Sequence, residues 1–158
     1  MTKLTDEKIR PESDSVERAI AEVGDSWSFL ILRDTFFGVR RFDALLNSIK
    51  VSPNILSDRL KKLVRYGILK KQAYQERPMR FEYRLTQKGR DLYPAIVLLM
   101  KWGDAWAGVT DGDGGASSEE APLILIHTAC GQPSNPKLIC DQCDQPILVR
   151  EMDWSTKD

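Results

Sequence analysis

The sequence contains little of what most enzymes use for catalysis. Its 158 residues include only three cysteines and one histidine, and all four lie between His127 and Cys143. No glycine-rich phosphate loop is present, and no nucleophile stands in a recognisable motif with a basic partner. We therefore do not expect an enzyme.

Long apolar runs are missing as well. The longest, from Ala95 to Met100, is far shorter than the roughly 20 residues that cross a bilayer. The segment from Met1 to Arg10 is polar and lacks the apolar centre of a secretory signal. These absences predict a cytoplasmic protein without a membrane span, in which thiols stay reduced and suit metal or redox chemistry better than structural disulfides.

Net charge is zero only on average, because 23 basic and 23 acidic residues are segregated along the chain. Between Phe37 and Arg90 there are 14 basic and 4 acidic residues, a net charge of +10, and the rest carries the balancing −10. Such segregation favours a polyanionic partner, although a solvated basic face would give the same counts. The 42% hydrophobic content is sufficient for a core, which excludes global disorder.

Apolar residues spaced three and four apart predict four helices in the first part of the chain. Glycines at 24 and 38 end two of them, and Ser52-Pro53 begins another, because serine caps a helix and proline suits its first turn. The expected helices are Ser13–Val23, Trp27–Phe37, Arg41–Ile49 and Pro53–Tyr66.

A hairpin and a closing helix should follow. The expected strands are Ile68–Tyr74 and Arg80–Leu85, and the tip between them holds Pro78 outside the ladder. Thr86 should cap the last helix, whose apolar stripe reaches Trp106 and which has a slight kink or a later start at Pro94.

The remainder divides by composition. Residues 111–121 are rich in glycine, serine and acid and resemble a linker. The tail has strand-like pieces at Leu123–Ile126, Leu138–Ile139 and Ile147–Val149. We expect an N-terminal arm at 1–12, a folded domain at 13–108, a linker at 109–121 and a tail at 122–158.

This order of elements describes a winged helix-turn-helix, a mainly α (α+β) fold with a two-stranded wing, here followed by a small β-rich tail. The helix from Pro53 would enter the major groove of double-stranded DNA, and the hairpin would reach phosphate or the minor groove. Asn54 can pair bidentately with adenine, and Ser57 can bond a base or a phosphate. The expected DNA contacts are Arg41, Ser52, Pro53, Asn54, Ser57, Arg59, Lys61, Lys62, Arg77 and Arg80.

A series of short motifs from Ser15 to Trp106 resembles the HxlR-type winged-helix regulators of bacteria. The matching pieces are Ser15-Val16-Glu17-Arg18-Ala19-Ile20, Gly24-Asp25-Ser26-Trp27, Ile31-Leu32-Arg33-Asp34, Arg40-Arg41-Phe42, Ser52-Pro53-Asn54-Ile55-Leu56-Ser57-Asp58-Arg59-Leu60, Tyr66-Gly67-Ile68-Leu69 and Phe81-Glu82-Tyr83-Arg84-Leu85-Thr86. The resemblance implies a sequence-specific transcriptional regulator. It also implies a homodimer paired through the first and last helices of the core, on a pseudo-palindromic operator.

Members of that family respond to redox signals or to small reactive and aromatic compounds, so the resemblance implies a response to an effector. In many of them a sensing cysteine lies just before the first core helix. Here Asp14 and Ser15 stand at that position and neither can form a thiolate. A signal would therefore enter elsewhere.

The tail carries a second pattern, His127-x2-Cys130-x9-Cys140-x2-Cys143. One histidine and three cysteines in two close pairs form the ligand set of a closed, structural Zn²⁺ site. Two alternatives stay open: a reversible Cys140–Cys143 disulfide without metal, or an unstructured tail with reactive thiols. A zinc–thiolate site that loses its ion on oxidation would combine metal and redox chemistry.

Large aromatic residues give a third signal. Trp27, Phe36, Phe37, Trp102 and Trp106 fall on or near the helices expected at the dimer interface, where a flat effector could bind between them. Ordinary packing explains the same spacing. The alternative for the whole protein is a protein-interaction adaptor that uses the winged helix and zinc ribbon as scaffolds; weak, non-specific DNA binding would distinguish it from a regulator.

Overall fold

The computed structural model describes residues 14–106, 123–148 and 152. The chain forms two compact units, Met1–Ile96 and Val97–Asp158, which are described separately below. The expected arm at 1–12 and the linker at 109–121 lie outside the described residues. Within the described ranges, no helix combines the length and the apolar character needed to cross a membrane.

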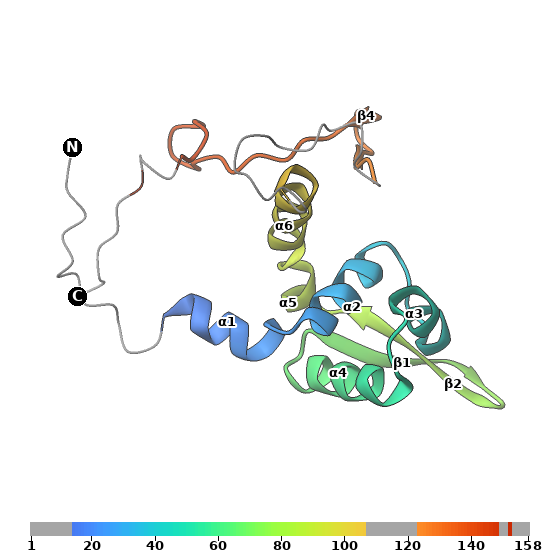
Figure 1. Cartoon of the computed structure of the whole chain (residues 1–158). Coiled ribbons are helices and arrows are strands. Elements are labelled where there is room, and N and C mark those ends of the chain that lie inside the picture. Colours follow the sequence, from blue (N-terminus) through green and yellow to red (C-terminus); the bar gives the residue numbers. More distant parts are fainter. Residues whose placement is uncertain (1–13, 107–122, 149–151, 153–158) are drawn as a thin grey trace. The chain divides into compact units, whose positions relative to one another are not determined.

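Four helices begin the first unit (Figure 1): α1, Ser15–Val23; α2, Ser26–Phe36; α3, Phe42–Ile49; and α4, Pro53–Arg65. All four were predicted, with ends that differ by one or two residues. Capping explains the starts. Asp14 accepts a hydrogen bond from the N–H of Glu17 at 2.8 Å, and Asp25 accepts one from Ser28 at 2.9 Å. Ser52 caps α4 as predicted, with a proline in the first turn.

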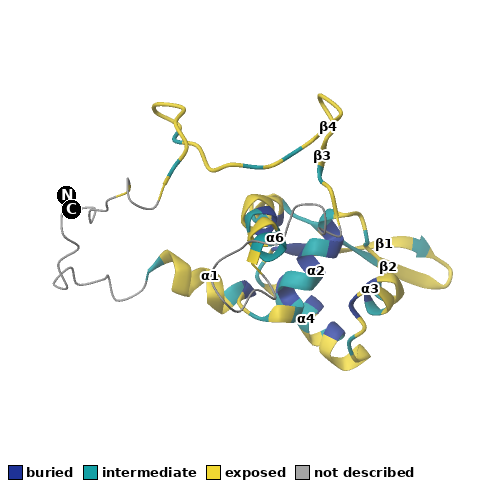
Figure 2. Ribbon diagram, turned by 45° about the horizontal axis from the view of Figure 1, so that its top comes forward, coloured by how far each residue is buried: buried dark blue, intermediate teal, exposed yellow. Residues whose placement is uncertain are grey.

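The core of this unit lies where α2, α3 and α4 meet the base of the hairpin (Figure 2). Leu56, Leu60 and Leu63 of α4 are completely buried and follow the helical i, i+4, i+7 spacing. Each large aliphatic side chain buried in this way contributes about 1.5–3 kcal/mol. The other fully buried apolar residues are Ile31, Leu32, Leu45, Ile68 and Leu69. Because α4 buries its leucine stripe here, its opposite face is left to solvent.

The hairpin consists of β1, Leu69–Glu76, and β2, Met79–Leu85, in antiparallel register. The predicted five-residue tip is wrong: the ladder continues to the Glu76–Met79 pair, so only Arg77 and Pro78 form the loop, across a cis peptide bond. Pro78 stays outside the ladder, as predicted. A bulge between Ala73 and Gln75 interrupts the register. Helices and hairpin together form the winged helix that the sequence predicted.

The closing segment is two helices, α5, Gln87–Arg90, and α6, Tyr93–Trp106. The sequence predicted one helix with a kink or later start at Pro94, and the structure has the later start. Thr86 caps α5 by accepting a hydrogen bond from the N–H of Gly89 at 3.1 Å. A Cβ atom at Gly89 would lie 2.3 Å from the carbonyl oxygen of Ile68, so this close approach of α5 to the base of β1 requires glycine.

The tail in the second unit contains less strand than predicted. Its strands are β3, Ile126–His127, and β4, Gln132–Pro133, which pair with each other. A single bridge joins Ile139 to Pro146. The predicted strands at Leu123–Ile126, Leu138–Ile139 and Ile147–Val149 are therefore wrong in extent, although Val149 lies outside the described residues. The β3–β4 pair and the Ile139–Pro146 bridge each enclose one tight turn.

Candidate nucleic-acid interface

The outward face of α4 is polar and accessible. Asn54 and Lys61 are exposed and Ser57 is half-buried, and the capping Ser52 and Pro53 are also exposed. These five predicted contacts lie along the surface opposite the buried leucines. The short side chains of the first turn allow a close approach to base edges, and the free N–H groups there favour a phosphate.

Two other predicted contacts on α4 are turned toward the protein. The Nε atom of Arg59 lies 3.0 Å from Oδ1 of Asp25, and Nζ of Lys62 lies 3.1 Å from Oδ2 of the same carboxylate. Asp25 also caps α2 and accepts a hydrogen bond from the Ser28 hydroxyl at 2.7 Å. One carboxylate thus connects the start of α2 to the middle of α4, which fixes the orientation of α4 relative to α2.

The electrostatic state of Asp25 follows from these contacts. Partial burial on its own raises the pKa of the carboxyl. The hydrogen bonds from Ser28 and Lys62 and the positive charge of Arg59 outweigh that effect and hold the pKa below its ordinary value of 3.8. Asp25 is therefore ionised at neutral pH, and both ion pairs are formed.

The wing presents a second basic surface. Arg77 in the loop and Arg80 in β2 are exposed, and the Gln75 side-chain amide donates to the carbonyl of Arg77 at 3.0 Å. Arg41, just before α3, is also exposed and forms an isolated bridge with Glu82 of β2. The start of α3 is thereby attached to the wing, so the helix-turn-helix and the hairpin form one surface.

Cation–π contacts add wing residues that sequence reasoning did not single out. The Nζ atom of Lys71 lies 4.1 Å from the ring centroid of Phe81, and the Arg41 guanidinium lies 4.5 Å from that of Tyr74. Each contact holds a cation at the exposed wing surface. The pairing of Lys71 and Phe81 could have been found from the strand register, because residues that alternate along paired strands share a face.

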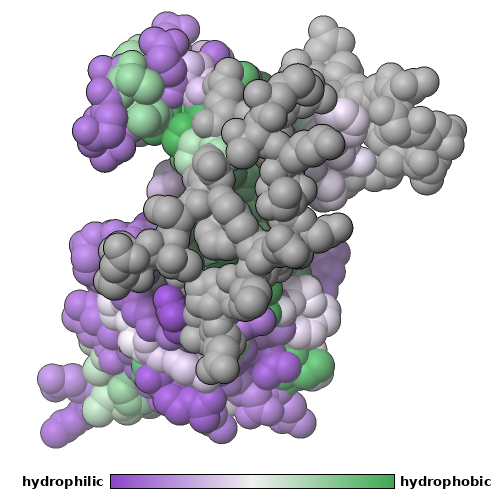
Figure 3. Space-filling view, turned by 90° about the vertical axis from the view of Figure 1, so that its left-hand side faces the viewer, coloured by the Kyte–Doolittle hydropathy of each residue, from purple (hydrophilic) through white to green (hydrophobic). Residues whose placement is uncertain are grey.

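Few of these cations are neutralised within the unit. Ion pairs among the described residues engage Arg33, Arg59, Lys62, Arg84 and Lys88, whereas the cations of Lys61, Arg77 and Arg80 pair with no described carboxylate. In Figure 3 the described residues of the lower part of the view, where this unit lies, are predominantly hydrophilic. The arrangement can bind a polyanion along α4 and the wing.

The five aromatic residues predicted to line an effector pocket are partly exposed. In the first unit, Trp27 and Phe36 are half-buried and Phe37 is exposed; Phe36 packs edge-to-face on Tyr93 at 5.1 Å between ring centroids. Trp102 and Trp106 of α6 are exposed. For Phe36, this ring contact fits ordinary packing, which the sequence left open as the alternative to an effector pocket.

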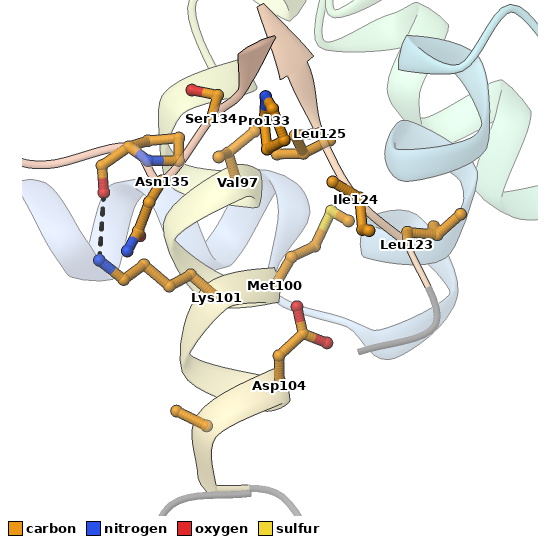
Figure 4. A pocket seen from close by; sticks show the side chains of 12 residues that line it. Val97, Met100, Lys101, Asp104, Leu123, Ile124, Leu125, Pro133, Ser134 and Asn135 are labelled. Atoms are coloured by element: carbon orange, nitrogen blue, oxygen red, sulfur yellow. Dashed lines mark hydrogen bonds between the residues drawn. The ribbon is translucent and has the colours of Figure 1, made fainter. Parts of the chain in front are cut away.

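A cavity of about 530 Å³ lies elsewhere, within the second unit (Figure 4). Its wall is α6 on one side and two tail segments on the other, and it is mainly apolar. Lys101 lies at its edge and donates a hydrogen bond to the carbonyl of Pro136 at 3.3 Å. None of the five predicted aromatics lines it; the lining residues are Val97, Met100, Lys101, Asp104, Ala105, Leu123, Ile124, Leu125, Pro133, Ser134, Asn135 and Pro136.

The predicted metal ligands are brought together in pairs. The Sγ atom of Cys130 lies 3.4 Å from Nδ1 of His127. Backbone N–H groups of Gln142 and Cys143, with the Cys143 thiol, hold the pKa of the half-buried Cys140 thiol below its usual value. Among the described residues, no three potential ligands gather in one group. The structure thus forms two half-sites and does not unite them.

A family model described as HxlR-like helix-turn-helix matches residues 22–111, more than half of the chain. A helix-turn-helix transcriptional regulator of Mycobacterium tuberculosis is 42% identical over 149 residues, which cover 94% of this chain and 89% of the relative. The chain belongs to the HxlR-like family. It is a transcriptional regulator of the helix-turn-helix class and not an enzyme, as the sequence predicted.

Solved structures agree with this HxlR-like assignment. A candidate transcription factor designated PA1607 superposes with a TM-score of 0.77 and 31% identity, over 92% of this chain and 96% of the other. The redox regulator HypR in its oxidized form superposes with a TM-score of 0.56 and 26% identity, over 60% of this chain and 98% of its own. The match to PA1607 covers more of this chain than the winged helix alone.

Proposed function

We propose that this HxlR-like chain is a homodimeric, cytoplasmic, sequence-specific regulator that inserts α4 into the major groove of a pseudo-palindromic operator. The wing lies on the flanking phosphates or in the minor groove. The observation that carries the proposal is the basic surface formed by the outward face of α4 and the wing, on which Lys61, Arg77 and Arg80 pair with no described carboxylate.

The residues divide into two roles on this surface. Lys61, Arg77 and Arg80, together with Arg41, contact phosphate, because long basic side chains reach the backbone without reading sequence. Asn54 and Ser57 read bases from the first two turns of α4. Arg59 and Lys62 act as positioning residues through Asp25 and set the angle at which α4 enters the groove.

Dimer formation has support in exposed apolar positions on the two helices that the family resemblance pairs. Val16 and Ile20 of α1 are 63% and 57% exposed, and Trp102 of α6 is 59% exposed. Apolar side chains at helical spacing that no described residue covers favour burial against a second copy. Two copies would place two α4 helices about one helical turn apart on the duplex.

The proposal also includes a response to an effector, specified only as an apolar ligand. An apolar ligand in the 530 Å³ cavity would contact α6, which is also a proposed dimer helix. A ligand that binds one dimer geometry better than another shifts the fit to the two half-sites. The aromatic set of Trp27, Phe36, Phe37, Trp102 and Trp106 remains the alternative effector site.

The test is binding of the full chain to its own promoter region, measured by fluorescence anisotropy with a scrambled duplex as reference. Asn54→Ala should lower the ratio of promoter affinity to scrambled-duplex affinity about tenfold, since a bidentate base contact is worth about 1–3 kcal/mol. Arg90→Ala, a charge change on α5, is the control and should leave the ratio unchanged. Equal, weak binding of the wild type to both duplexes would instead favour the adaptor function.

A further inference from the structure

The two ligand pairs of the tail lie on two separate backbone turns of the same kind. In the first, the N–H groups of Cys130 and Gly131 donate to the carbonyl of His127 at 3.2 and 2.8 Å. In the second, the N–H of Asp144 donates to the carbonyl of Cys140 at 3.0 Å. The intervening residues differ, Thr-Ala in one and Asp-Gln in the other, so the shared turn does not come from a shared local sequence.

Both turns end in the same uncommon conformation. The residue after the second ligand is left-handed in each, with φ of +69° at Gly131 and +55° at Asp144. Glycine adopts this region freely, and aspartate is among the few other residues that tolerate it. Left-handed residues at both positions reverse the chain directly behind the second ligand of each pair.

The spacing of the donors matches a tetrahedral ion. Zn²⁺ binds sulfur at about 2.3 Å and imidazole nitrogen at about 2.0–2.1 Å, which sets the two donor atoms about 3.6 Å apart. The observed separation of Cys130 Sγ and His127 Nδ1 is 3.4 Å. In the other turn, the N–H of Asp144 donates to the carbonyl of Cys140 at 3.0 Å and the N–H of Cys140 donates to the carbonyl of Gln145 at 2.9 Å, so one tight turn holds both cysteines. Each turn thus presents two donors suited to one ion.

Packing does not explain why these turns are formed. None of the described residues from Leu123 to Leu148 is buried, and Leu138 and Ile139 are more than half exposed. Residues 134–138, which connect the two turns, have no regular secondary structure. A segment with so little buried apolar surface needs another source of folding free energy, and metal coordination supplies it in other small modules.

We propose that one Zn²⁺ ion binds His127, Cys130, Cys140 and Cys143 of the same chain, bringing the two turns together through the segment at 134–138. The three thiols release protons on binding and coordinate as thiolates, and the histidine binds through its neutral ring. The filled shell leaves no open position for water, so the ion is structural. Its binding also fixes Leu125 and Pro133, which wall the cavity beside α6.

Elemental analysis of the full chain, purified without chelators, tests the proposal. The wild type should carry close to one zinc per chain. Cys140→Ser and Cys143→Ser should lose most of it, whereas Thr128→Ala and Gln142→Ala, which change the same turns without removing a ligand, should retain it. Far-ultraviolet circular dichroism of each variant confirms that the winged helix is folded.

Cobalt substitution identifies the donor set. Wild-type protein loaded with Co²⁺ should show the visible bands of a tetrahedral ion with three thiolates, and His127→Cys should keep the ion and shift those bands toward the pattern of four thiolates. Protein without zinc that takes up no cobalt overturns the proposal, as does a chain mass two hydrogens lower from a Cys140–Cys143 disulfide. Zinc that survives Cys140→Ser also overturns it. DNA affinity is measured separately and does not enter these outcomes.

Discussion

The winged-helix unit and the tail maintain their structures in different ways. The first buries Ile31, Leu32, Leu45 and the leucines of α4 completely, whereas no described residue of the tail is buried. Packed helices hold the proposed DNA contacts of the first unit on a rigid surface. The tail has two turns, two short strands and one bridge. The comparison teaches that packing sets the positions of the side chains along α4, whereas the described tail buries too little surface for packing to set its shape.

The largest effect should come from a cavity in the core. Leu60→Ala removes a side chain that is 0% exposed, and large-to-small changes of this kind cost about 2–5 kcal/mol. Leu138→Ala, at a residue 54% exposed in the tail, should cost less than about 0.5 kcal/mol. Urea denaturation of each variant measures the difference. Equal losses would contradict the view that only the first unit depends on packing.

The second largest effect should come from removing the proposed zinc ion, which should destabilise the tail and leave the winged helix folded. Chelation should expose the tail to proteolysis within residues 123–148, because each turn loses the ion that connects it to the other. The thermal midpoint of the winged helix should change by no more than about 2 °C, because its core contains none of the ligands. Limited proteolysis with mass spectrometry, alongside calorimetry, measures both. Parallel loss of both units on chelation would show that they fold as one.

Charge at the proposed dimer helices should weaken self-association. Ile20→Glu places a charge at an apolar position that is 57% exposed in one chain, and the two-fold axis doubles the effect in the dimer. The dissociation constant should rise at least tenfold, given about 1.5–3 kcal/mol for each large apolar side chain buried. Analytical ultracentrifugation measures it. Met79→Glu, at an equally exposed residue of the wing, is the control, and an identical shift in both variants would argue against pairing through α1.

The smallest effect concerns the orientation of α4. Asp25→Asn keeps a good helix cap but removes both ion pairs, which should cost about 1 kcal/mol at neutral pH, since the carboxylate is one-quarter exposed. The pKa of Asp25 is lower in the folded chain than in the unfolded one. The stabilisation is therefore complete above pH of about 4 and is lost as pH falls through the folded value. Denaturation measured from pH 7 to pH 3 should show the unfolding free energies of the wild type and Asp25→Asn converging. A difference that stays constant with pH would instead assign the loss to the helix cap.

Local signals predicted most of the first unit. The Ser52-Pro53 start of α4 and the Thr86 cap act within one helical turn, so their residue types alone indicate the boundaries. The orientation of Arg59 and Lys62 could not be predicted in this way, because both face Asp25, more than 30 residues earlier in the chain. Their spacing on α4 is equally compatible with phosphate contact.

In the tail, by contrast, the hydrophobic pattern predicted more strand than the structure contains. Apolar pieces such as Leu138–Ile139 suggested strands, but the backbone pairs over two residues at most and turns at the cysteines instead. Hydrophobic pattern predicts strands where a sheet can bury one face, and this segment has no such partner among its described residues. The spacing of the candidate ligands was the better guide to this segment, because each pair separated by two residues lies in a tight turn.

The salt dependence of DNA binding tests the central claim most directly. The logarithm of the association constant for the promoter duplex should fall linearly with the logarithm of salt concentration, and each phosphate contact contributes about 0.9 to the slope. Lys61→Ala and Arg77→Ala should each reduce the slope by about one and weaken binding to all duplexes alike, while Arg90→Ala leaves it unchanged. A slope that is the same in the wild type and in both interface variants would contradict the assignment of α4 and the wing as the DNA-binding surface.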